Sequence, residues 1–122
     1  MRKGTGEQLF GYVAECLAKF LSDNHDLIKD KRPHHMGFTF SYPCDQRAIN
    51  HGILQRWTKG FDVQGVEGHD VVPMFQKALK EKGVDIDVTA VVNDTTGTLI
   101  ASNYTDPTTQ IGCIFGTGIN FP

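Results

Sequence analysis

Apolar side chains recur every three or four residues between Phe10 and Leu21, which places them on one face of a helix. Ahead of this run, Thr5 and Gln8 stand three positions apart and form a possible capping box. Polar residues at 22–24 end the pattern. We therefore predict an amphipathic helix that begins after Thr5 and ends at this polar segment.

Alternation of apolar and polar positions predicts strands further along the chain. Aromatic residues take every second position over Met36–Tyr42, and Pro43 stops this strand. Gly52–Trp57 is a second predicted strand. The β-branched run Ile86–Val92 predicts a buried strand, and Gln110–Phe115 is the last strand that the pattern indicates.

Two further helices separate these strands. Asp70 is a suitable N-cap for a helix that has Pro73 in its first turn, and Gly83 is a suitable C-terminal stop. A shorter helix is expected over Thr95–Asn103. The order of helix, strand, strand, helix, strand, helix, strand favours an α/β sheet with parallel pairing.

Composition narrows the class of protein without naming a function. The 122 residues are 39% hydrophobic, which suits one domain with a packed core. Lys and Arg number 12 against 14 Asp and Glu, and the resulting charge of −2 argues against a nucleic-acid partner. No apolar run could span a membrane, and no secretory leader is recognisable. Three widely spaced cysteines without a C-x-x-C pair predict free thiols, no structural metal and a cytoplasmic protein.

Polar groups suited to binding or catalysis lie where the predicted strands end. In open α/β sheets, ligands bind outside the carboxyl ends of the strands. The groups at these ends are a hydroxyl, two amides, one carboxylate and a glycine loop, which together suit a polyol. They belong to Ser41-Tyr42-Pro43, Asn93-Asp94, and Gly116-Thr117-Gly118 with Asn120 beyond.

Each of these groups also has a simpler interpretation. Ser41 can merely close a strand, and Lys59 can be an ordinary solvated lysine. Asp94, the one candidate general base of the set, can act only as a helix N-cap. The Gly116-Thr117-Gly118 loop lacks the third glycine and the following helix of a dinucleotide site.

Five segments of the chain, taken in order and spacing, resemble the hexokinase family. The resemblance extends from about Gln8 to Asn120, and the Trp-Thr-Lys-Gly-Phe block is most similar to the eukaryotic members. It implies an RNase H-like or actin-like ATPase fold, α/β in class, with an incomplete sheet flanked by helices. The five segments are Phe38–Pro43, Leu54–Phe61, Gly68–Val72, Val92–Leu99 and Ile114–Asn120.

The resemblance also implies a reaction and the residues that serve it. The family transfers the terminal phosphoryl group of MgATP to the 6-hydroxyl of glucose or a similar hexose, with ATP and Mg²⁺ as cosubstrate in the complete enzyme. The Asp of the Asn-Asp-Thr motif is the family's catalytic base, and Asp94 holds that position. Thr117 matches a threonine near the nucleotide phosphates. The positions matching sugar-binding residues are Ser41, Tyr42 (in place of the common Phe), Pro43, Thr58, Lys59, Asn93 and Asn120.

By the same resemblance the chain divides into three parts. Residues 1–93 match the later part of the small domain, 94–104 a connecting helix at the hinge, and 105–122 the first strand and Gly-Thr-Gly loop of the large domain. The family's Asp-x-Gly-Gly-Thr-Asn phosphate hairpin, second phosphate loop, adenosine pocket and two sugar-binding glutamates have no counterpart in this sequence. We therefore expect the isolated chain to show little or no kinase turnover.

Three functions remain open from the sequence. The chain is part of a hexokinase, or a truncated module that binds a hexose without catalysis, or an actin-like half-domain that binds no ligand. An incomplete sheet is also expected to leave an uncovered edge and exposed apolar surface, and both favour self-association.

Overall fold

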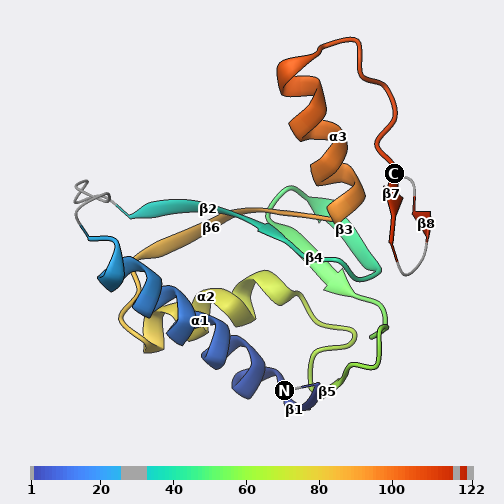
Figure 1. The fold of residues 1–122 in the computed structure, drawn as a ribbon. Coiled ribbons are helices and arrows are strands. Elements are labelled where there is room, and N and C mark those ends of the chain that lie inside the picture. The colour runs from blue at the N-terminus through green and yellow to red at the C-terminus, as the bar shows by residue number, and fades with distance from the viewer. Residues whose placement is uncertain (1, 26–32, 117–118, 121–122) are drawn as a thin grey trace.

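The computed structural model describes residues 2–25, 33–116 and 119–120. A two-stranded parallel sheet, β2 (His34–Thr39) with β6 (Ile86–Val92), forms the centre of the molecule. Helices α1 (Gly6–Asp23) and α2 (Val71–Glu81) pack together against one face of this sheet (Figure 1). Helix α3 (Asp94–Thr105) starts at the carboxyl end of β6 and projects to the opposite side.

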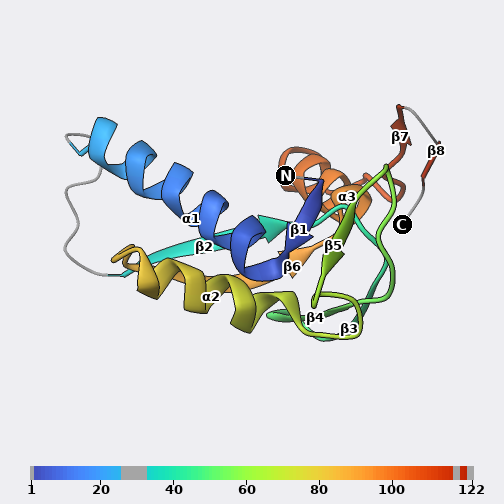
Figure 2. The same ribbon diagram turned by 90° about the horizontal axis from the view of Figure 1, so that it is seen from below.

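Three smaller ladders surround this centre, and each has two strands. Figure 2 shows the β1–β5 ladder at the N-terminal end of α1. The pairs are β1 (Lys3–Thr5) with β5 (Asp62–Gln64), which is parallel, and two antiparallel hairpins, β3 (Cys44–Ala48) with β4 (His51–Leu54) and β7 (Ile114–Phe115) with β8 (Ile119–Asn120).

The predicted ends of α1 and α2 are confirmed. Thr5 Oγ1 accepts the N–H of Gln8 at 3.2 Å, and Gln8 Oε1 accepts the N–H of Thr5 at 3.0 Å, which is a complete capping box. Asp70 Oδ1 accepts the N–H of Val72 at 3.0 Å and caps α2. The chain leaves α2 through Gly83, whose φ of +68° suits glycine.

The two central strands lie where the alternation predicts them, but one differs in length. Strand β6 spans Ile86–Val92, as predicted. Strand β2 spans His34–Thr39 instead of Met36–Tyr42. The reason is a bend, because the N–H of Tyr42 turns back to the carbonyl of Phe40 at 3.0 Å and leaves the ladder.

The predicted strand Gly52–Trp57 is too long, and the sequence does not reveal its partner. Strand β4 ends at Leu54, and the last bond of the hairpin runs from the N–H of Gln55 to the carbonyl of Pro43 at 2.8 Å. Strand β3 has the sequence Cys-Asp-Gln-Arg-Ala, which is mostly polar and lacks alternation. A strand of this composition has no period-two pattern, so the sequence does not indicate the hairpin.

The C-terminal elements also differ from their predicted bounds. The strand predicted over Gln110–Phe115 contracts to the two residues of β7, and the helix predicted over Thr95–Asn103 extends over Asp94–Thr105. Parallel pairing is confirmed for β2–β6 and β1–β5, whereas β3–β4 and β7–β8 are antiparallel. The parallel pairing that the order of elements favours therefore holds for two of the ladders. The other two are antiparallel, because β3 and β4, like β7 and β8, are joined by connections too short for a parallel crossover.

Buried aromatic and aliphatic side chains fill the space between the β2–β6 sheet and the two helices. Phe75 of α2 is 1% exposed, and its ring lies 4.9 Å from that of Phe38 and 5.7 Å from that of Phe10. This contact joins the sheet to both helices. Other large side chains that are fully buried in the described part of the chain are Leu54, Val66, Val71 and Leu79.

The free edge of β6 is closed by a side chain of α2 and by the β3–β4 hairpin. Gln76 Nε2 donates to the carbonyl of Ile86 at 2.6 Å, and Gln76 Oε1 accepts the N–H of Val88 at 3.0 Å. Further along, the N–H of Val91 donates to the carbonyl of Ile49 in the hairpin at 2.7 Å. The side chain of Gln46 donates to the carbonyl of Val91.

We expect Gln76→Ala to lower the free energy of unfolding by about 1–3 kcal/mol, because two partly buried backbone groups lose their partners. Urea denaturation followed by circular dichroism measures this change. Gln110→Ala, at an exposed position, is the matched control and should leave stability unchanged. Equal stability of the two variants would show that Gln76 does not close the edge.

Large apolar side chains are exposed along α3 and the segment after it, as the sequence predicts. Ile100, Tyr104, Ile111 and Phe115 are 56%, 90%, 74% and 77% exposed, respectively. Self-association through a sheet edge stays a prediction. The edge of β6 is not available for it, because Gln76 and the hairpin already occupy that edge.

Candidate functional site

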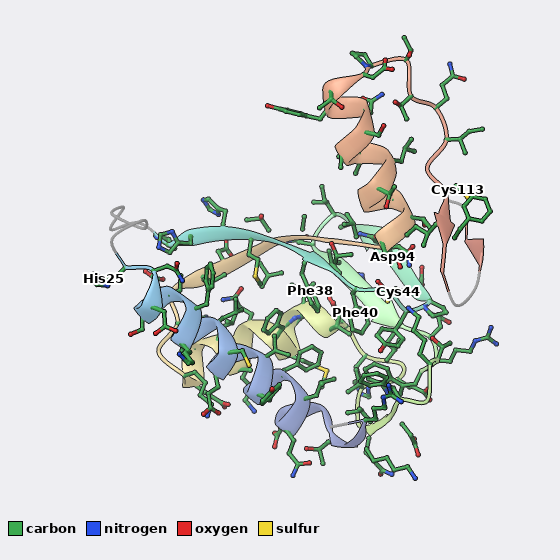
Figure 3. The ribbon with its side chains drawn as sticks, viewed as in Figure 1. His25, Phe38, Phe40, Cys44, Asp94 and Cys113 are labelled. Atoms are coloured by element: carbon green, nitrogen blue, oxygen red, sulfur yellow. The ribbon has the colours of Figure 1, made fainter. Side chains whose placement is uncertain are left out.

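The carboxyl ends of β2 and β6 lie side by side. Thr39 pairs with Val92 in the parallel register, and the N–H of Phe40 continues the pairing with a 2.9 Å bond to the carbonyl of Val92. Ser41 and Asn93 therefore leave the two strands at the same edge. Figure 3 shows Asp94 beyond this edge. This is the position at which α/β sheets bind their ligands.

Asn93 and Asp94 form the start of α3. Asn93 is the N-cap, and its Oδ1 accepts the N–H of Thr95 at 3.1 Å and the Thr95 hydroxyl at 2.7 Å. Asp94 is the first helical residue, which corrects its simpler interpretation as the N-cap. Asp94 Oδ1 also accepts the N–H of Thr95 at 3.0 Å, and Oδ2 has no hydrogen bond to any described residue. One carboxylate oxygen is thus free to accept a proton.

Lys59 reaches this edge from the turn between β4 and β5. Its Nζ donates to the carbonyl of Ser41 at 3.0 Å and lies 5.4 Å from the centre of the Tyr42 ring. The turn is closed by a 3.1 Å bond from the N–H of Phe61 to the carbonyl of Thr58, which is half-buried. Ser41, Tyr42, Thr58 and Lys59 therefore share one neighbourhood, although they come from separate segments.

Aromatic side chains form the wall behind Lys59. The ring of Tyr42 lies 4.8 Å from that of Trp57 and 5.6 Å from that of Phe61, edge to face in both cases. Burial raises the pKa of the Tyr42 phenol, and the charge of Arg2 opposes part of that rise. The hydroxyl of Tyr42 is therefore neutral near pH 7 and can donate a hydrogen bond.

Pro43 and Cys44 lie where the chain enters the β3–β4 hairpin. The carbonyl of Pro43 accepts the N–H of Gln55 at 2.8 Å, so it is already engaged within the protein. Burial and, to a lesser degree, the charge of Asp70 raise the pKa of the Cys44 thiol. Cys44 therefore stays protonated at neutral pH and is poorly suited to act as a nucleophile.

The β7–β8 hairpin lies beside the start of α3 in both ribbon views (Figures 1 and 2). The chain passes α3 so closely that a Cβ on Gly112 would come within 3.0 Å of the Thr95 carbonyl. Asn120 is in β8, where its backbone pairs with Ile114. Thr117 lies outside the described residues, so its expected position near a nucleotide is not tested.

Glu67 also belongs to this region, although no motif in the sequence points to it. Its Oε1 accepts the N–H of Trp57 at 2.6 Å, and the two residues lie on different turns. Such a contact depends on how the turns meet in space, so no local pattern could have indicated it.

A metal-binding group and a membrane-spanning helix are both absent from the described ranges. No group of three or more His, Cys, Asp or Glu side chains there could hold a metal ion. None of the helices in the same ranges combines the length and the apolar character that crossing a bilayer requires.

Comparisons with known proteins show which family this chain resembles. The profile of the family described as hexokinase matches residues 1–104. A hexokinase from Kluyveromyces lactis is 54% identical over 121 residues, which is 98% of this chain and 24% of that protein. Hexokinase-2 of Rattus norvegicus is 49% identical over 119 residues, or 97% of this chain and 13% of its own.

A solved structure gives the same result for the fold. The hexokinase from Schistosoma mansoni complexed with glucose superimposes with a TM-score of 0.90 at 44% identity, over 98% of this chain and 26% of that one. The expected actin-like ATPase fold class is therefore confirmed. The chain spans about a quarter of the length of the fungal relatives that it matches.

Proposed function

The chain belongs to the hexokinase family, and on this premise we propose that it carries the sugar-binding edge and the general base of an ATP-dependent hexose 6-phosphotransferase. We assign residues 1–93 to the small domain, 94–104 to a connecting helix and 105–122 to the start of the large domain.

One observation supports this proposal best, namely the convergence of Ser41, Lys59 and Asn93-Asp94 at the joint end of β2 and β6. A hexose presents several hydroxyl groups that both donate and accept hydrogen bonds. An ammonium, an amide and a hydroxyl at one edge satisfy such groups from different directions. The structure from S. mansoni, whose similarity covers nearly all of this chain, is a complex with glucose.

In the proposed reaction, Asp94 acts on the 6-hydroxyl of the sugar. Oδ2 of Asp94 accepts the hydroxyl proton while the sugar oxygen bonds to the terminal phosphorus of ATP, and the bond from that phosphorus to the bridging oxygen breaks to release ADP. Oδ1 remains bonded to the N–H of Thr95, which fixes the orientation of the carboxylate. The N-terminus of α3 also favours the negative charge of Asp94.

Besides Asp94, we place Lys59 in contact with the hexose. The other groups proposed to surround the sugar are Ser41, Thr58, Asn93, Asn120 and the Tyr42-Pro43 backbone. MgATP is the cosubstrate of the complete enzyme and supplies the phosphoryl group. The described residues contain no set of metal-holding side chains, so we assign no step with Mg²⁺ to them. Thr117 is the proposed contact of this chain with the nucleotide phosphates.

A second candidate is a module that binds a hexose without catalysis. It concerns the 122 residues by themselves, which contain no Asp-x-Gly-Gly-Thr-Asn sequence. Phosphoryl transfer needs groups that hold and neutralise the phosphates. A coupled assay of the 122-residue chain with glucose and MgATP should show little or no turnover, and robust turnover would exclude this candidate.

The sugar site is tested by calorimetric titration of the chain with glucose. We expect Lys59→Ala to weaken binding about tenfold, because a charged hydrogen-bond donor is lost. Lys80→Ala is the matched control, since Lys80 is exposed in the last turn of α2, and it should keep the original affinity. Equal affinity of the two variants would remove Lys59 from the sugar site.

A further inference from the structure

The turn that carries Thr58 and Lys59 has neither a ladder nor a helix to hold it. Residues 55–58 have no regular secondary structure. Lys59 has a φ of +58°, a left-handed conformation that is unfavourable for a residue with a Cβ atom. Such a conformation persists only where neighbouring contacts impose it. The contacts that hold this turn therefore decide where its two side chains point.

The carboxylate of Glu67 holds the start of the turn. Its Oε1 accepts the backbone N–H of Trp57, the residue before Thr58, at 2.6 Å. A bond to an ionised acceptor is stronger than a bond between neutral groups. Glu67 forms no ion pair with any described residue, so its carboxylate is not drawn away from this N–H.

Glu67 itself stands on a turn that the core fixes. The preceding residue, Val66, is fully buried. The following residue, Gly68, donates its N–H to the carbonyl of Leu54 at 2.8 Å, and the N–H of Leu54 donates to the carbonyl of His69 at 3.1 Å. These bonds tie the Glu67 turn to the end of β4, from which the Lys59 turn starts.

A second contact holds Trp57 from its other side. The indole Nε1 donates to the carbonyl of Val63 in β5 at 2.8 Å, and the ring packs against Tyr42. With its backbone bonded to Glu67 and its ring bonded to β5, Trp57 cannot rotate freely. The orientation of Lys59, two residues further on, toward Ser41 follows from this restraint.

We propose that Glu67 is a positioning residue for the sugar site, which acts through Trp57 to hold Thr58 and Lys59 toward the hexose. This inference rests on the proposed function, because it assumes that Lys59 contacts the sugar. Glu67 lies outside the segments that resemble the hexokinase family. It acts on the substrate only through the backbone of Trp57.

The experiment compares Glu67→Ala with Glu67→Gln in the 122-residue chain. The glutamine keeps an oxygen acceptor at the same reach, whereas alanine leaves the Trp57 N–H without a partner. Calorimetry measures glucose affinity, and amide hydrogen exchange measures the protection of the Trp57 N–H. Glu81→Ala is the control, because Glu81 is also exposed and its carboxylate lies 3.7 Å from Nζ of Lys77, away from the Lys59 turn.

We expect Glu67→Ala to weaken glucose binding about tenfold and to speed exchange at Trp57 by about tenfold, with Glu67→Gln within about threefold of the original chain in both. Original affinity and protection in Glu67→Ala would overturn the proposal, and so would equal loss in Glu67→Ala and Glu67→Gln. If the unaltered chain binds no glucose, the proposed function fails, and with it the role of Glu67 at a sugar site. Exchange at Trp57 then still shows whether Glu67 holds the turn.

Discussion

Asp94→Asn, placed in a full-length hexokinase that carries this segment, is expected to lower kcat by about 10²–10⁴-fold. The amide cannot take the proton of the attacking hydroxyl, so the oxygen must attack the phosphorus as a poorer nucleophile. The amide oxygen can still accept the N–H of Thr95, so the first turn of α3 keeps its geometry. Glucose affinity should therefore stay within about threefold.

A suitable host is the Kluyveromyces lactis hexokinase, which is 54% identical over 121 residues, with this chain put in place of the matching segment. Asp106→Asn is the matched control. Asp106 is exposed at the end of α3, and hydrogen bonds from Thr108 lower the pKa of its carboxyl. The control should leave kcat unchanged. A near-normal kcat in Asp94→Asn would remove Asp94 from the role of base.

Phe75→Ala is expected to lower the free energy of unfolding by about 3–5 kcal/mol. The side chain of Phe75 is 1% exposed and touches the rings of Phe10 and Phe38, so its removal leaves a cavity where α1, α2 and the sheet meet. Urea denaturation measures the loss. A chain of this size has a total stability of about 5–15 kcal/mol, so the variant should be largely unfolded at moderate urea.

The control for Phe75→Ala is Phe115→Ala, since Phe115 is 77% exposed in β7. We expect that variant to stay within about 0.5 kcal/mol of the original chain. Comparable losses at both positions would mean that the β2–β6 sheet and its helices do not form the core.

The sequence predicts those elements whose signals are local. The capping box of Thr5 and Gln8 and the N-cap at Asp70 depend on residues a few positions apart, and both are present. Strand β6 is long and apolar enough to show its bounds. The hairpin strand β3 could not be predicted, because its sequence is mostly polar and shows no alternation, although its partner β4 follows directly in the chain.

The candidate site divides in the same way. The rule that ligands bind at strand ends selects Ser41 and Asn93-Asp94 from the sequence, and the structure brings these ends together. Lys59 enters through the family resemblance and not through any local pattern. Glu67 could not be found by either route, since its contact with Trp57 joins two turns whose meeting depends on the buried Val66.

The central claim is that a hexose binds where β2 and β6 end together. It is tested most directly by an NMR titration of the isotope-labelled chain with glucose, in which each backbone amide reports its own surroundings. We predict that the largest shift changes fall on Ser41, Lys59, Asn93 and Asp94, with little change along α1 and α2. Saturable changes confined to other parts of the chain, or no change at saturating glucose, would contradict the account.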